Sequence, residues 1–143
     1  MTSPRPRAND GDQDPADLAF RRELARAQAI LDRHGHGFAV AGVEFVGAPL
    51  TLGPLALAGL GGHFRGTDLW TASGRRIFGL LVAVDEVGVR MALERLHLAC
   101  QGVPATQGTP WVQAHLVARS GESADALMRR LRTRLTDAAA VVV

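Results

Sequence analysis

The sequence contains no lysine, no tyrosine, a single cysteine and no apolar run long enough to cross a bilayer. The lone Cys100 excludes an internal disulfide and any zinc site built from cysteines. A membrane-spanning helix needs about 20 consecutive apolar residues. The polar N-terminus also has no apolar core of the kind found in signal peptides. We therefore expect a cytoplasmic protein that does not contact the membrane.

The chain also has little excess charge, because 16 basic residues are nearly balanced by 14 acidic ones and the net charge is +2. A nucleic-acid-binding domain usually carries a strongly basic face, so no direct binding of nucleic acid is expected. All the basic residues are arginines, whose planar fork can grip guanine edges and phosphates. The 47% share of hydrophobic residues, in a chain of 143, is that of one globular domain with a core of its own.

Periodicity divides the chain into a polar N-terminal tail, residues 1–13, and one domain over residues 14–140. Helical spacing predicts helices over residues 16–35, 49–64, 86–101 and 120–135, and alternation or β-branched runs predict strands over residues 37–47, 68–73, 77–85 and 111–120. Gly35 is expected to end the first helix, Ser120 or Ser123 to cap the last one, and residues 138–143 to form an apolar tail.

The order of these elements predicts an α+β sandwich with a central, mainly antiparallel sheet. The short turn around Gly74, Arg75 and Arg76 predicts a β-hairpin within that sheet. The sheet is expected to be flanked by helices, and we place those helices on one of its faces.

Four stretches, taken in order and spacing, resemble the GGDEF domain, the catalytic fold of diguanylate cyclases. They are DPADLAFRREL at 14–24, RGTDLWTASGRRIFGLLVA at 65–83, ALERL at 92–96 and SGESADALMRRLRTRL at 120–135. The resemblance covers roughly residues 14–138. It implies a ferredoxin-like or palm-like fold.

The same resemblance implies that catalysis has been lost. Gly74, Arg75, Arg76, Ile77 and Phe78 stand where active members carry the acidic turn that holds divalent metal. Arginine offers only donors and cannot ligate Mg²⁺. Glu44 is the one acid in the strand expected to supply the other metal carboxylate. We therefore expect no catalytic residues, no bound metal and no cofactor.

The sequence matches a feedback site of the family better than it matches the family's catalytic turn. Many members bind cyclic di-GMP through an R-x-x-D motif five residues before the signature turn, and Arg65 and Asp68 have that spacing here. The resemblance adds Arg95 as a second arginine of the site. A guanidinium fork suits guanine O6 and N7, and a carboxylate can accept from guanine N1 and N2.

The implied function is a non-catalytic module that binds cyclic di-GMP and acts on an unknown protein partner or on a second copy of itself. The alternative is a protein-interaction or dimerisation scaffold that binds no nucleotide, in which Arg65 and Asp68 form only a salt bridge. Four arginines of the last predicted helix, Arg129, Arg130, Arg132 and Arg134, spread around it and suggest a solvated surface or a contact with an acidic partner.

Overall fold

The computed structural model describes residues 15–46, 69–82, 85–101 and 109–142. The helices are α1 (Pro15–His34), α3 (Glu86–Gln101) and α4 (Ala124–Val142), and the strands are β1 (Phe38–Phe45), β2 (Leu69–Ser73), β3 (Arg76–Val82) and β4 (Trp111–Val117). The tail over 1–13 and the predicted helix over 49–64 lie outside these ranges. Among the described helices, none combines the length and apolarity that crossing a membrane requires.

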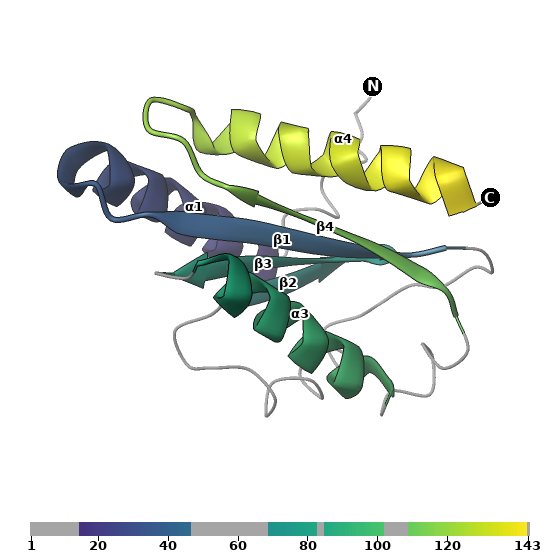
Figure 1. Ribbon diagram of the computed structural model, residues 1–143. Helices are drawn as coiled ribbons and strands as arrows, with labels where there is room; N and C mark the ends of the chain where they lie inside the picture. Colours follow the sequence, from purple (N-terminus) through teal and green to yellow (C-terminus); the bar gives the residue numbers. More distant parts are fainter. Residues whose placement is uncertain (1–14, 47–68, 83–84, 102–108, 143) are drawn as a thin grey trace, which may run out of the picture.

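The four strands form one sheet in the order β2-β3-β1-β4, and every neighbouring pair is antiparallel. The predicted α+β fold with a central antiparallel sheet is therefore confirmed (Figure 1). β1 lies inside the sheet and is buried along almost its whole length. This explains why its sequence is a nearly continuous apolar run rather than an alternating one.

Helices cover both faces of the sheet, so the prediction that they cover only one face was wrong (Figure 1). On one face, α3 packs against a cluster that includes Ala41, Val43 and Phe45 of β1. On the other, α1 and α4 pack against a second cluster that includes Phe38 and Val40, the alternate residues of the same strand. An apolar run that is buried on both sides leaves no polar residues to mark a solvent-facing side, which is why the second covered face could not be predicted.

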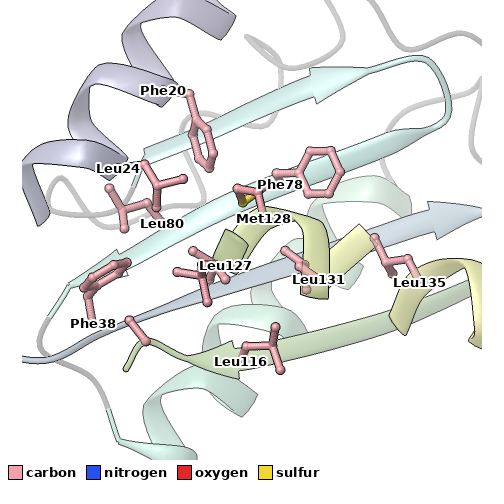
Figure 2. Packing of buried hydrophobic residues seen from close by; sticks show 12 residues of the cluster. Phe20, Leu24, Phe38, Phe78, Leu80, Leu116, Leu127, Met128, Leu131 and Leu135 are labelled. Atoms are coloured by element: carbon pink, nitrogen blue, oxygen red, sulfur yellow. The ribbon is translucent and has the colours of Figure 1, made fainter. Parts of the chain in front are cut away.

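Figure 2 shows the cluster on the α1/α4 face. Phe20 and Leu24 of α1 point towards the sheet, and a row of α4 side chains packs over β1, β3 and β4. That row consists of Leu127, Met128, Leu131 and Leu135, all at helical spacing and all buried.

The ends of the helices follow local chemistry. Gly35 has a φ of 74° and its N–H donates to the Leu31 carbonyl, so it ends α1 as expected. The Ser123 hydroxyl accepts from the N–H of Ala126 at 3.0 Å, which makes Ser123, rather than Ser120, the N-cap of α4. The predicted apolar tail is wrong for residues 138–142, because α4 continues to Val142. Alanine favours helix and no glycine or proline interrupts this stretch.

The predicted hairpin is confirmed. β2 and β3 pair from Leu69↔Leu80 to Ser73↔Arg76, and a two-residue turn of Gly74 and Arg75 joins them. Gly74 has a φ of 62°, a conformation that glycine adopts without strain. The hairpin places Arg76 and Phe78 on the α1/α4 side of the sheet, where Phe78 joins the apolar cluster and Arg76 donates to Thr136 of α4.

Candidate functional site

The three residues expected to bind cyclic di-GMP are not brought together by the described part of the structure. Arg65 and Asp68 lie outside the described residues. Arg95 lies on α3 and is partly buried. Within the described ranges, its side chain forms no hydrogen bond or ion pair with another residue.

The residues of the altered turn are placed clearly. Ile77 is 1% exposed and belongs to the cluster beneath α3, whereas Phe78 belongs to the cluster beneath α1 and α4. Arg76 projects to the same side as Phe78 and contacts Glu44, its register partner on β1. Ile77 and Phe78 thus pack into the apolar clusters on opposite faces of the sheet, whereas Arg76 pairs with Glu44.

The contact between Arg76 and Glu44 is a short, charge-assisted hydrogen bond. The Nε of Arg76 donates to Oε1 of Glu44 at 2.6 Å, and the two side chains are only 22% and 13% exposed. A terminal nitrogen of Arg76 also donates to the Thr136 hydroxyl of α4 at 3.0 Å. One guanidinium therefore links β3, β1 and α4.

This ion pair decides what chemistry the corner can perform. The carboxylate of Glu44 is engaged by a fixed positive charge, which would repel a divalent cation placed beside it. Nowhere in the described ranges do three or more histidine, cysteine, aspartate or glutamate side chains group in a way that could hold a metal ion. In the described ranges, the Arg76–Glu44 corner is thus an ion pair whose carboxylate is already engaged by an arginine.

A cavity of about 390 Å³ lies next to this corner, between α1, α4 and the β2–β3 hairpin. It is lined by Phe20, Arg21, Leu24, Thr71, Arg76, Phe78, Ala124, Asp125, Met128 and Arg132. Figure 2 shows Phe20, Phe78 and Met128, which come to this place from three different elements. Sequence reasoning missed this cavity, because no spacing rule relates positions 21, 71 and 132.

The arginines of α4 separate into two groups, as their spread around the helix suggested. Arg132 lines the cavity, with its Cζ 5.8 Å from the centre of the Phe78 ring. Arg129, Arg130 and Arg134 line a groove on the outer side of α4 together with Glu122 and Asp137. In that groove, two nitrogens of Arg130 each donate to Glu122 at 2.7 Å, and this bonding lowers the pKa of the Glu122 carboxyl.

No protein-family model and no curated protein matches the chain by sequence. Solved structures of Pseudomonas aeruginosa proteins do match it in fold. The GGDEF domain of YfiN (TpbB) superposes with a TM-score of 0.66 at 15% identity, over 87% of each chain. The diguanylate cyclase SiaD, solved in complex with its activator SiaC, superposes with a TM-score of 0.63 at 16% identity, over 87% of this chain and 56% of SiaD.

PelD, solved as a 156–455 fragment in complex with c-di-GMP, superposes with a TM-score of 0.56 at 22% identity. That match covers 85% of this chain and 46% of the PelD chain. The chain thus spans little more than half of SiaD and less than half of the PelD fragment. At these identities the likeness establishes the architecture. The element order, the antiparallel sheet and its helices on both faces are the fold of GGDEF domains.

Proposed function

We propose that the protein is a non-catalytic module of GGDEF fold that binds cyclic di-GMP and passes on that signal through protein contacts. The observation that carries the non-catalytic part is the ion pair between Arg76 and Glu44. In the family that the sequence resembles, acids at these two places hold divalent metal for the reaction of GTP. Here one of them is replaced by an arginine that binds the other, so metal-assisted chemistry has no support at this corner.

Binding of cyclic di-GMP is proposed on two grounds. Arg65 and Asp68 keep the spacing of the family's feedback motif, with five residues between Asp68 and the altered turn. PelD, whose fold is similar, was solved with this ligand. Arg95, on α3, completes the proposed site. Its guanidinium is not engaged by another residue of the described ranges, so its donors are available for a base or a phosphate.

A nucleotide-independent scaffold is the second candidate, and exposed apolar side chains of α3 favour it. Val87, Met91 and Leu98 are 58%, 52% and 65% exposed and recur at spacings of four and seven, as on one side of a helix. Such a stripe suits packing against another protein. SiaD, one of the fold neighbours, was solved with a protein activator bound.

Isothermal titration of the purified chain with cyclic di-GMP tests the proposal. We expect a dissociation constant of about 1–10 μM, near −7 to −8 kcal/mol. Binding should be lost in Arg65→Ala and weakened at least about tenfold in Arg95→Ala, because each removes a charged hydrogen bond. Arg90→Ala, which removes an exposed arginine from the same helix, is the matched control and should bind normally.

The outcomes separate the two candidates. Absence of heat at tens of micromolar ligand would reject the receptor and leave the scaffold in its place. Incubation with GTP and Mg²⁺ should yield no cyclic di-GMP. Formation of that product would show that the Arg76–Glu44 corner does not prevent catalysis.

A further inference from the structure

The groove on the outer side of α4 is lined by more positive than negative side chains. Its charged lining consists of four arginines and two acids, Arg119, Arg129, Arg130, Arg134, Glu122 and Asp137. Arg130 is already engaged, because two of its nitrogens donate to Glu122, and these two side chains are only 28% and 13% exposed. Arg129 and Arg134 are exposed and, in the described ranges, form no hydrogen bond or ion pair with another residue.

Arg129 and Arg134 lie on opposite margins of this groove. Each residue turns an α-helix by about 100°, so two side chains five positions apart diverge by about 140° around the axis. Between these margins lie Ala126 and Thr133, which are seven positions apart and also line the groove. Because both side chains are small, the backbone of a second helix could approach α4 closely along this line.

The arginines of the groove are not arranged to stabilise α4 itself. Arg130 and Arg134 are four positions apart, where like charges on a helix repel each other. Arg119, from the connection between β4 and α4, adds another guanidinium to the same groove. Carboxylates supplied by a partner would reduce this repulsion and would accept from the donors that the described residues leave free.

We propose that the outer groove of α4 binds a helix of a partner protein that presents glutamate or aspartate along both of its margins. Carboxylates of that helix pair with Arg129 and Arg134, and its small side chains face the line between them. The lining residues of α4 extend from Ala126 to Asp137, a rise of about 17 Å along the axis. A partner helix of about three turns covers this length.

The two acids of the groove favour an acidic protein over a ligand rich in phosphate. Glu122 and Asp137 would repel the closely spaced phosphates of a nucleic acid or an anionic membrane. A helix avoids this repulsion, because it can place a neutral or basic side chain beside each of them. The inference rests on the proposed function only in naming a partner for its protein contacts. It does not require cyclic di-GMP, since α4 and the α3 helix that carries Arg95 cover opposite faces of the sheet.

Titration of the full chain with a synthetic alanine–glutamate helix of about 15 residues tests the inference. The same peptide with glutamine in place of glutamate is the control ligand. At low ionic strength the acidic helix should bind with a dissociation constant below about 0.5 mM, and the control at least about tenfold more weakly. Binding should weaken about tenfold between about 20 and 200 mM salt, because the charge pairs are exposed to solvent.

Three variants locate the binding surface. Arg129→Gln/Arg134→Gln should weaken binding of the acidic helix at least about tenfold. Asp137→Asn removes a negative charge from the groove and should strengthen binding about two- to fivefold. Arg22→Gln/Arg33→Gln removes two exposed arginines from α1 and is the matched control, which should bind like the parent chain. Because all these side chains are exposed, each variant should keep the urea midpoint of the parent.

The inference is overturned if the glutamate and glutamine peptides bind alike, or if Arg129→Gln/Arg134→Gln binds like the parent chain. It is also overturned if anionic lipid vesicles or single-stranded DNA bind more tightly than the acidic helix and lose that binding in this double variant. Self-association that the double variant abolishes would assign the groove to a second copy instead. The titrations contain no nucleotide, and Arg95→Ala should bind the acidic helix normally, so that failure of the cyclic di-GMP proposal cannot be mistaken for failure here.

Discussion

Arg76 is a residue whose role depends on partners far away in the sequence. It binds Glu44, 32 positions earlier, and Thr136, 60 positions later. The Glu44 side chain is only 13% exposed, so its charge relies on this arginine. A partly buried carboxylate that loses a cationic partner destabilises the fold, even where the intact pair adds little stability by itself.

Arg76→Met is therefore expected to lower the free energy of unfolding by about 1–3 kcal/mol. The double variant Glu44→Gln/Arg76→Met should recover part of the loss, because it removes the unpaired charge. Urea unfolding of the four chains in this cycle measures the coupling. Arg129→Met, on an exposed position of α4, should change stability by no more than about 0.5 kcal/mol. An Arg76→Met chain as stable as the parent would contradict the claim that Glu44 depends on Arg76 for charge compensation.

At the scale of residues, the sequence alone predicts the loss of the acidic turn but not what replaces it. The letters Gly74-Arg75-Arg76 already exclude metal ligation there. That Arg76 binds Glu44 depends on the β1–β3 register, which places the two residues opposite each other. Register is fixed by the packing of the whole sheet, so local patterns cannot supply it. The cavity near Arg132 and Thr71 could not be predicted either, because its lining residues come from elements that only tertiary packing brings together.

At the scale of elements, the carboxylates of Asp32 and Glu122 form hydrogen bonds that hold the connection between β4 and α4 in place. Asp32 of α1 accepts from the N–H of Gly121 at 2.8 Å, and Gln28 donates to Asp32 and to the Arg119 carbonyl. The bond from Gly121, followed by that from Gln28, lowers the pKa of Asp32. Glu122, in the same connection, has its pKa lowered by Arg130. Both groups are therefore more acidic in the folded chain than in the unfolded one.

This arrangement predicts that stability falls in acid. A lowered folded pKa means that the unfolded chain binds more protons, so the stabilisation is present above the unfolded values of about 4 and is lost as pH falls below them. The free energy of unfolding should thus decrease between about pH 5 and pH 3. Urea titrations across this range should show a shallower decrease in Asp32→Asn/Glu122→Gln, which is also less stable at pH 7. An unchanged pH slope in that variant would exclude these carboxylates as the cause.

Element boundaries were predictable where a single residue sets them. Gly35 ends α1 through its positive φ, and Ser123 caps α4 through its hydroxyl. The length of α4 was missed because its last turns are exposed and have no sharp stop signal. Which helices cover which face could not be derived, because the strand β1 is apolar towards both. Local chemistry thus determines where a helix begins or ends, whereas tertiary packing determines which face of the sheet it covers.

At the scale of the whole molecule, two cores share one sheet. Leu96 of α3 is fully buried on one face and Leu131 of α4 on the other, while β1 contributes alternate side chains to both clusters. The two Trp side chains, Trp70 and Trp111, report on the α3 face. Because each face needs the same strand, neither core is expected to persist when the other is lost.

Leu96→Ala and Leu131→Ala should each lower the free energy of unfolding by about 2–5 kcal/mol, the usual cost of such a cavity. In both variants, tryptophan fluorescence and far-UV circular dichroism should follow the same urea transition. Leu98→Ala, which truncates a side chain that is 65% exposed, is the matched control and should have little effect. Early loss of fluorescence in Leu96→Ala, with native dichroism retained, would show that the faces unfold separately.

The place of β1 within the sheet has a consequence for biosynthesis. Among the described strands, β1 is made before both of its neighbours, β3 and β4, and the second of these ends only at Val117. Until then the nascent chain carries an apolar strand with at least one unpaired edge, the kind of surface on which chains aggregate. The described sheet therefore cannot be completed until β4 and the helix that covers it have left the ribosome.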